Sequence, residues 1–521
     1  MRNFKKKFDI PPAWLSWFTL LCVLLILPGF GAGMRWTAKA GGGWASKIDP
    51  WLLTTAPGGE AEFLIFHSEQ ADLSGAARLS TKQAKGAYVF RQLTEVASRT
   101  QAPILTELER RGVPHRSFWI ANMIWARGDL QLIASLAVRE EVARLYANPR
   151  VRLDFPLPEP VILPHQRLDG IEWNIDLVQA PALWAEGYTG QGIVIGGQDT
   201  GYDWEHPALK GHYRGWDGFT VDHNYNWHDA IHEAPGNPCG DDAVAPCDDH
   251  GHGTHTMGIM VGEDPEQTNR IGMAPGARWI GCRNMDEGFG TPASYAECYQ
   301  WFIAPTDLNG ANPDPTKAPH LINNSWGCPP SEGCTEPDIL LAVVEAVRAT
   351  GILTVHSAGN SGPACGSIDT PAAIYDASFT VGNTTAKDNV NLSSSRGPVT
   401  VDGSGRLKPD VSAPGTSIRS SWPGGIYISL TGTSMAGPHV AGLAALLFSA
   451  RPDLVGQVDQ VEHLIASTAL PIPVTQTCGG IPGDQFPNHV VGWGRIDAWR
   501  AYQPLENRHF IPLVTYTTFQ D

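Results

Sequence analysis

Three short segments of the chain carry side chains that could act together in acyl transfer. They are Gln198–Asp203, His250–His255 and Gly432–His439. A serine hydroxyl is a poor nucleophile until a neighbouring base takes its proton, so we predict that Ser434 attacks and that His252 is its base. A buried carboxylate from Asp199 would hold the imidazole in the required tautomer and stabilise the cation that forms. These residues together predict hydrolysis through an acyl-enzyme.

The order Asp, His, Ser along the chain separates this arrangement from other serine hydrolases. The three segments resemble the active-site signatures of the subtilisin-like serine peptidases, the subtilase family, and the resemblance covers residues 170–500. Residues 171–208 resemble the bacillopeptidase F-type members in particular. The resemblance implies a serine endopeptidase with an α/β fold, in which a predominantly parallel sheet is flanked by helices. A small α+β propeptide module is expected to precede that fold.

The same resemblance implies further site residues. Asn360, which ends the segment Ser357–Asn360, is expected to donate a hydrogen bond to the tetrahedral intermediate. Its alternative role is a turn or a helix cap. Two stretches are expected to bind the substrate backbone along an exposed strand edge. They are Ser325, Trp326 and Gly327, and the glycines Gly288 and Gly290.

Histidines cluster around the expected base, but their spacing does not favour a metal site. Glycines separate His250, His252 and His255, and no matched carboxylate or cysteine spacing follows, as a zinc site would require. We expect His255 and His439 to make structural hydrogen bonds rather than to take part in chemistry.

A run of acidic residues lies just before the histidines. It comprises Asp241, Asp242, Asp248 and Asp249. We interpret this run as a solvated loop, with calcium binding as the alternative, because no spacing in it matches a known calcium loop. No cofactor is expected to be required, and the sequence does not place a structural calcium ion.

The elements that must position these residues follow a βαβ pattern. Residues 192–198 predict a strand that ends at Asp199, residues 321–324 a second strand and residues 352–357 a third, with a helix over 338–348 between the last two. The carboxyl ends of parallel strands form the rim where ligands bind. A buried helix over 434–450 would place the nucleophile at a helix N-terminus, with Pro438 near its first turn.

The residues before this region predict a separate small module, which we bound at 60–155. Apolar strands at 63–66 and 118–125 alternate with amphipathic helices at 83–99 and 130–146. In outline the module resembles the family's inhibitory propeptides, and an independent accessory domain is the alternative. Residues 78–152 hold 13 Lys and Arg against 6 Asp and Glu, although the whole chain has a net charge of −16.

The remaining boundaries follow from composition. Residues 156–169 are a proline-rich linker and the expected processing zone, with cleavage between Leu153 and Asp169. The catalytic domain is expected over 170–505, and a C-terminal tail over 506–521. Residues 1–33 combine basic residues, an apolar run and small residues, which is typical of a signal peptide. The alternative is a retained membrane anchor that leaves the catalytic domain outside the cytoplasm.

Cysteine usage agrees with an exported protein. Apart from Cys22 in the apolar run there are eight cysteines, and an even number outside the cell suggests disulfide bonds. Cys239 with Cys247, and Cys328 with Cys334, are close enough in sequence to close single loops. The alternative is free, buried thiols.

The acidic charge of the chain bears on its partners. Phosphates would be repelled, which argues against a nucleic acid, and we expect polypeptide substrates and the chain's own propeptide instead. A membrane is a partner only if the N-terminal segment is retained. The sequence therefore predicts a secreted endopeptidase that processes itself. The alternatives are a catalytically silent binding protein with the same fold, or a transpeptidase or cyclase in which an amine replaces water.

Overall fold

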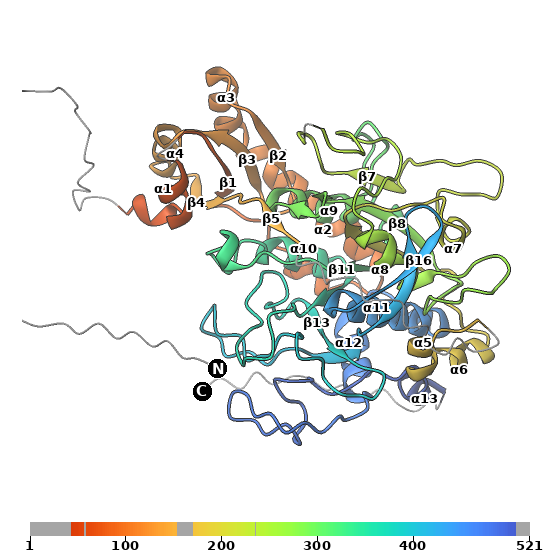
Figure 1. Cartoon of the computed structure of the whole chain (residues 1–521). Coiled ribbons are helices and arrows are strands. Elements are labelled where there is room, and N and C mark those ends of the chain that lie inside the picture. Colours follow the sequence, from red (N-terminus) through yellow and green to blue (C-terminus); the bar gives the residue numbers. More distant parts are fainter. Residues whose placement is uncertain (1–42, 57–58, 154–169, 235, 507–521) are drawn as a thin grey trace, which may run out of the picture. The chain divides into compact units, whose positions relative to one another are not determined.

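A seven-stranded sheet forms the centre of the region that follows residue 170 (Figure 1). The computed structural model describes residues 43–56, 59–153, 170–234 and 236–506. The strand order is β14-β13-β12-β11-β6-β8-β7, and neighbouring strands run parallel. The strands are β6 (Val194–Asp199), β7 (Trp227–Asp229), β8 (Arg278–Arg283), β11 (Leu321–Asn324), β12 (Leu353–Ser357), β13 (Phe379–Thr384) and β14 (Val411–Pro414). The predicted α/β fold with a parallel sheet is confirmed.

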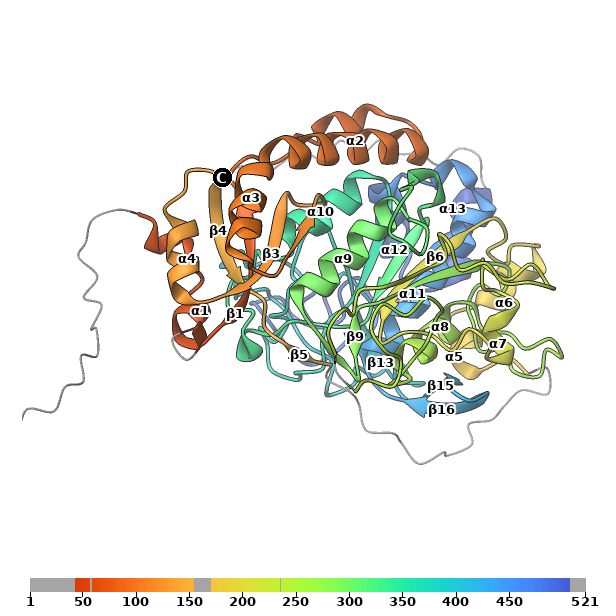
Figure 2. The same ribbon diagram turned by 90° about the horizontal axis from the view of Figure 1, so that it is seen from above.

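Helices cover both faces of this sheet (Figure 2). Side chains of a strand alternate between its faces. In β11, Leu321 accordingly joins the buried apolar cluster that includes α8 (His252–Val261) and α11 (Thr433–Ala450), whereas Ile322 joins the cluster with α9 (Pro292–Ile303) and α10 (Leu341–Ala349). α8 and α11 also pack against each other. The site residues carried by these helices are therefore anchored in the core.

The N-terminal module is an antiparallel sheet of order β2-β3-β1-β4 with helices, which agrees with the predicted α+β architecture. Its strands are β1 (Ala61–His67), β2 (His115–Phe118), β3 (Met123–Gly128) and β4 (Val142–Ala147). Its helices are α1 (Pro50–Thr55), α2 (Lys82–Thr100), α3 (Ala102–Arg111) and α4 (Leu130–Ala137). Ile48 and Leu52 belong to the core of this module, although they precede its predicted start.

One element of this module differs from the sequence prediction. Residues 130–146, expected as a single helix, form α4 and then β4, which pairs with β1. Likewise the strand expected at 118–125 is interrupted by turns and continues as β3. Apolar periodicity over a short window does not distinguish a helix from a strand, and here pairing with a distant strand decides.

The remaining elements are short. The strands are β5 (Val151–Arg152), β9 (Met285–Asp286), β10 (Phe289–Gly290), β15 (Ile418–Trp422) and β16 (Ile426–Leu430). The helices are α5 (Trp173–Leu177), α6 (Ala180–Ala185), α7 (Pro207–Lys210), α12 (Val458–Ser467) and α13 (Ala498–Glu506). The 3₁₀ helices are η1 (Ala45–Lys47), η3 (Ser74–Arg78), η4 (Pro315–Lys317), η5 (Pro330–Glu332) and η6 (Pro452–Leu454).

Four disulfide bonds link all eight cysteines of the described chain that follow Cys22 in the sequence. They are Cys239–Cys247, Cys282–Cys298, Cys328–Cys334 and Cys365–Cys478. The two predicted single-loop bridges are present among them. Within the described ranges, no helix has both the length and the apolar character that a bilayer span requires. The signal segment, the linker and residues 507–521 lie outside those ranges.

Candidate active site

Asp199 and His252 form a buried pair at the carboxyl end of β6. Asp199 is its last residue, and His252 is the first residue of α8. The Oδ1 atom of Asp199 lies 2.7 Å from Nδ1 of His252, and the two residues are 1% and 0% exposed. A Cβ atom at Gly253 would lie 3.0 Å from that of Asp199 and 2.1 Å from the carbonyl oxygen of Gly201. The glycine therefore allows α8 to approach the strand end this closely.

Ser434 is the second residue of α11 and is 3% exposed. Its Oγ donates to the carbonyl oxygen of Ser325 at 3.2 Å, and the Oγ of Ser325 donates back to the carbonyl oxygen of Ser434 at 3.1 Å. α11 begins one residue earlier than predicted, so Pro438 is its sixth residue, and its missing N–H would otherwise donate to that same carbonyl of Ser434. Ser325 supplies the donor that the proline lacks, and this fixes the first turn of α11.

Asn360 follows β12 and contacts the start of α11. The backbone N–H of Thr433 donates to its Oδ1 at 2.9 Å, and the hydroxyl of Thr433 donates to the same atom at 3.1 Å. Because the Oδ1 of Asn360 accepts both hydrogen bonds from Thr433, its Nδ2 group faces away from Thr433. Asn360 and Ser434 line one pocket. The amide donor is thus positioned beside the hydroxyl.

Asp248 was missed as a site residue by sequence reasoning. Its Oδ1 accepts from the Thr200 hydroxyl and from the backbone N–H groups of His250 and Gly251. Its Oδ2 accepts from the backbone and the hydroxyl of Thr254. One carboxylate therefore ties the residue after Asp199 to the start of α8. The signal available in the sequence was an acidic residue four positions before the first residue of α8, close enough to favour the N-terminal dipole.

A strand edge runs along one side of the site. β10 pairs in antiparallel fashion with β5, and the backbone N–H of Leu153 donates to the carbonyl oxygen of Gly288 at 2.7 Å. Gly288 has a φ of +80°, a conformation that favours glycine. The two glycines at 288 and 290 thus lie on an edge that already binds an extended segment of the same chain.

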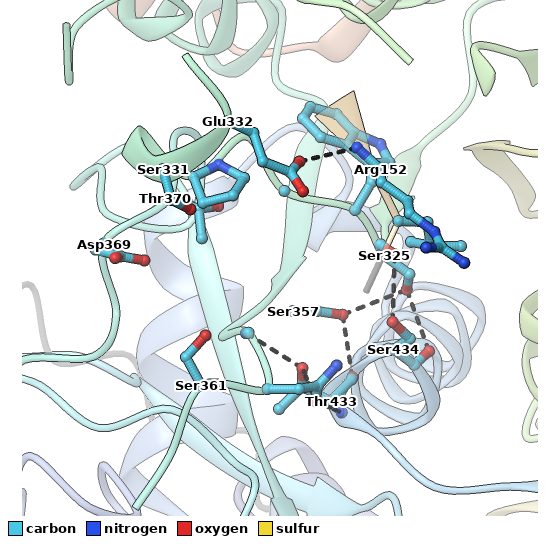
Figure 3. A pocket seen from close by; sticks show the side chains of 16 residues that line it. Arg152, Ser325, Ser331, Glu332, Ser357, Ser361, Asp369, Thr370, Thr433 and Ser434 are labelled. Atoms are coloured by element: carbon cyan, nitrogen blue, oxygen red, sulfur yellow. Dashed lines mark hydrogen bonds between the residues drawn. The ribbon is translucent and has the colours of Figure 1, made fainter. Parts of the chain in front are cut away.

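A cavity of about 540 Å³ opens beside Ser434 and is shown in Figure 3. The segments Ser325–Gly327 and Ser357–Ser361 contribute to its lining, and residues 152 and 153 reach it from β5 and just beyond. Trp326 is predicted to flank the substrate, and its indole stacks on Tyr295 with ring centroids 3.9 Å apart. It is 6% exposed, so its backbone rather than most of its ring is available to a substrate.

Comparison with known proteins decides the family. The model of the Subtilase family (Peptidase_S8) matches residues 190–494, which is more than half of the chain. The chain belongs to the subtilase family. This confirms the predicted family and its class of enzyme, the subtilisin-like serine endopeptidases.

Relatives of this subtilase include proteins of different lengths. It is 35% identical to Bacillopeptidase F of Bacillus subtilis (strain 168) over 472 residues, which are 84% of this chain but 31% of that protein. It is 29% identical to Subtilisin E of the same organism over 409 residues, which are 78% of this chain and 91% of the relative. Subtilisin Savinase of Lederbergia lenta is 31% identical over 310 residues, covering 59% of this chain and 95% of the relative. The chain thus spans about a third of the first relative and most of the other two.

The acidic run of this subtilase is not a solvated loop throughout. The side chains of Asp249 and Arg283 are both fully buried and lie 2.6 Å apart, and Asp229 and Asp286 contact the same guanidinium. Burial raises the pKa of Asp249 to about 6, although Arg283 opposes that rise. The solvated interpretation is therefore wrong for Asp248 and Asp249, because structural donors hold them. Among the described residues no group of three or more His, Cys, Asp or Glu side chains is arranged to hold a metal ion.

The two histidines expected to be structural are buried and bonded to the backbone. The Nε2 atom of His255 lies 3.1 Å from the carbonyl oxygen of Ile418, and Nδ1 of His439 lies 2.8 Å from that of Met435. Burial lowers the pKa of His255 to about 3 and that of His439 to about 4. Both rings therefore stay neutral near pH 7, as structural hydrogen-bonding groups would.

Proposed function

We propose that this subtilase is a secreted serine endopeptidase that hydrolyses peptide bonds of extracellular proteins and is made as a self-processed zymogen. The observation that carries the proposal is the pairing of β5 with β10. An extended segment of the chain occupies a strand edge beside a pocket lined by Ser434. A substrate backbone binding in the same way would place its carbonyl near that hydroxyl. The apolar segment near the N-terminus and the four disulfide bonds support export.

In the proposed mechanism, the Oγ of Ser434 attacks the scissile carbonyl carbon while His252 takes its proton. Asp199, already bonded to Nδ1 of His252, orients the ring and stabilises the imidazolium. The oxyanion accepts from the Nδ2 group of Asn360 and from N–H groups at the start of α11. When the carbon–nitrogen bond breaks, His252 gives its proton to the leaving amine. Water then repeats the cycle and releases the acyl group.

Contacts of residues 43–153 support their proposed role as the propeptide. Arg127, Arg144 and Arg150 pair with Glu233, Glu336 and Asp286 of the acidic part of the chain. In each pair the module supplies the cation, in agreement with its opposite charge. Exposed pairs contribute about 0 to 1 kcal/mol each, so they set orientation more than affinity.

Hydrogen bonds also join the same two parts. The backbone N–H groups of Trp119 and Ile120 donate to the side-chain oxygen of Gln300 at 2.7 and 3.2 Å. The hydroxyl of Tyr146 donates to Asp338 at 3.0 Å. With the module bound in this way, residues 151–153 block the edge that a substrate would need.

Intact-mass measurement of the exported protein tests the proposal, together with a casein-cleavage assay. Wild type is expected to lose its N-terminal residues up to the processing zone and to digest casein, whereas Ser434→Ala does neither. Ser449→Ala, elsewhere on α11, is the matched control and should behave as wild type. If Ser434→Ala is processed and active, the assignment of the nucleophile fails. If purified, processed wild type is inert and does not react with an organophosphorus reagent, the binding-protein alternative replaces it.

A further inference from the structure

The pocket beside Ser434 is acidic once the N-terminal segment is set aside. Among the described residues that line it, three are charged: Arg152, Glu332 and Asp369. Arg152 belongs to β5, which the proposed processing removes. Two carboxylates then remain in a cavity whose other walls are mostly serines, threonines and glycines, together with Trp326, Pro329 and Asn360. Such a cavity disfavours an acidic side chain and attracts a cation.

Asp369 has no cation to balance it within the described chain. Its carboxylate is partly buried, and among the described residues neither an ion pair nor a hydrogen bond from another residue reaches it. Burial raises its pKa above the ordinary value. Two other buried carboxylates do have a cation: Asp229 pairs with Arg283 and Glu462 with Arg348. An unpaired, partly desolvated carboxylate is costly unless a ligand pairs with it.

Asp369 is positioned to meet the end of a substrate side chain that enters the pocket. Its neighbour Thr370 lies close to two segments that line the pocket. The Oγ1 of Thr370 would lie 2.8 Å from a Cβ atom at Gly327, and its methyl carbon would lie 4.0 Å from a Cβ atom at Gly359. In Figure 3, Asp369 lies on the side of the pocket opposite Ser434. A side chain that enters beside the nucleophile would therefore cross the pocket to reach this carboxylate.

Glu332 is the second carboxylate, and it is occupied while the N-terminal segment is bound. Its Oε2 accepts from the backbone N–H of Arg152 at 2.8 Å. Removal of that segment frees Glu332 at the mouth of the same cavity. The acidic character of the pocket is thus greatest in the processed protein.

We propose that this pocket binds the Lys or Arg side chain of the residue whose carbonyl Ser434 attacks, with Asp369 as its principal cation acceptor. This inference rests on the proposed function, because it names the substrate class of the same site. Charge-assisted hydrogen bonds and charge complementarity would select the basic residue, and like charge would reject Asp and Glu.

The test uses processed wild type and a set of peptides that differ only in the residue before the scissile bond, which is Arg, Lys, Leu or Glu. We expect kcat/KM for Arg and Lys to exceed that for Leu by about 10- to 100-fold, the range for a hydrogen bond to a charged group. Asp369→Asn should lose most of this advantage in the ratio of kcat/KM for Arg over Leu. Titration of Ser434 with an organophosphorus reagent reports whether the variant is folded.

Asp376→Asn is the matched control, because it removes the same charge from a side chain that is 91% exposed and outside this pocket. It should keep the preference for Arg. The inference is overturned if Ser434 reacts with an organophosphorus reagent but Arg and Leu peptides are cleaved alike, or if Asp369→Asn keeps the full preference. If Ser434 does not react and no peptide is cleaved, the proposed function fails and this inference falls with it.

Discussion

The side-chain amide of Asn360 has a fixed orientation in the free site. Two donors from Thr433 hold its Oδ1, so the Nδ2 group is aimed before any substrate binds. Preorganised donors of this kind act where negative charge develops, because they require no rearrangement during the reaction. Thr433 is also the residue that precedes Ser434, so the backbone connects the donor's partner directly to the nucleophile.

We therefore expect Asn360→Ala to lower kcat while leaving KM nearly unchanged. In subtilisin, loss of one oxyanion-hole donor costs about 10²- to 10³-fold in kcat, and we adopt that scale. Steady-state kinetics on the Arg peptide would measure it. Asn391→Ala is the control for the loss of an asparagine side chain, because Asn391 does not line the pocket. A selective rise in KM would contradict the role assigned to Asn360.

The pH dependence of substrate selection also belongs to the residue scale. The pKa of Asp369 is raised by burial, so its charge is lost at a higher pH than that of an ordinary aspartate as the solution is acidified. The ratio of kcat/KM for Arg over Leu peptides should then fall on acidification, whereas in Asp369→Asn, where Glu332 is the remaining carboxylate of the pocket, it should change less. Taking the ratio removes the titration of the catalytic groups, which both substrates share. A ratio that rises in acid would contradict this.

At the scale of elements, α9 anchors the loop that follows β7. Its buried Glu297 accepts from Nε2 of His232 at 2.9 Å and lies equally close to Nε2 of His228 in β7. Burial alone would lower the pKa of His232, but hydrogen bonds and charge from Glu297 and Asp242 outweigh it, so the pKa is raised. The carboxylate of Glu297 is in turn stabilised, and its pKa is lowered despite burial.

This histidine should make stability depend on pH in a defined direction. Because the pKa of His232 is higher in the folded state than in the unfolded state, its protonation stabilises the fold. This stabilisation is complete below the unfolded-state pKa, about 6.5, and is lost as the pH rises through the folded-state pKa. In the inactive Ser434→Ala background, His232→Gln should lower the free energy of unfolding by about 1.5 to 3 kcal/mol at pH 5.5 and by less at pH 9. Denaturant unfolding at the two pH values measures this. An equal or larger loss at pH 9 would refute it.

At the scale of the whole molecule, the basic N-terminal module and the acidic part of the chain meet in the small sheet β5-β10-β9. The N-terminal module contributes β5 to that sheet, and the acidic part contributes β10. Self-processing must cut the chain between them. Arg167 is the only Lys or Arg in residues 154–169, so a pocket that selects basic residues predicts a single preferred position in the processing zone.

N-terminal sequencing of the mature protein should therefore begin at Leu168. Arg167→Ala should slow processing by about 10-fold or more, and Arg167→Lys should restore it, because a pocket carboxylate accepts either cation. A mature chain that starts elsewhere in the zone, or an alanine variant processed at the normal rate, would contradict the link between pocket charge and processing.

Much of this protein could be predicted from its sequence because the signals are local. The strand ending at Asp199, the glycines before and after His252 and the small residues after Ser434 each specify a nearby backbone. Tertiary structure decided the rest. Only strand pairing with β1 makes residues 142–147 a strand, and only the fold brings Arg283 to bury Asp249. Likewise, Asp369 and Glu332 lie 37 positions apart, and nothing but the packing of two loops places both carboxylates in the pocket of Ser434. Charge in a cavity is a property of side chains that meet in space, which sequence order does not record.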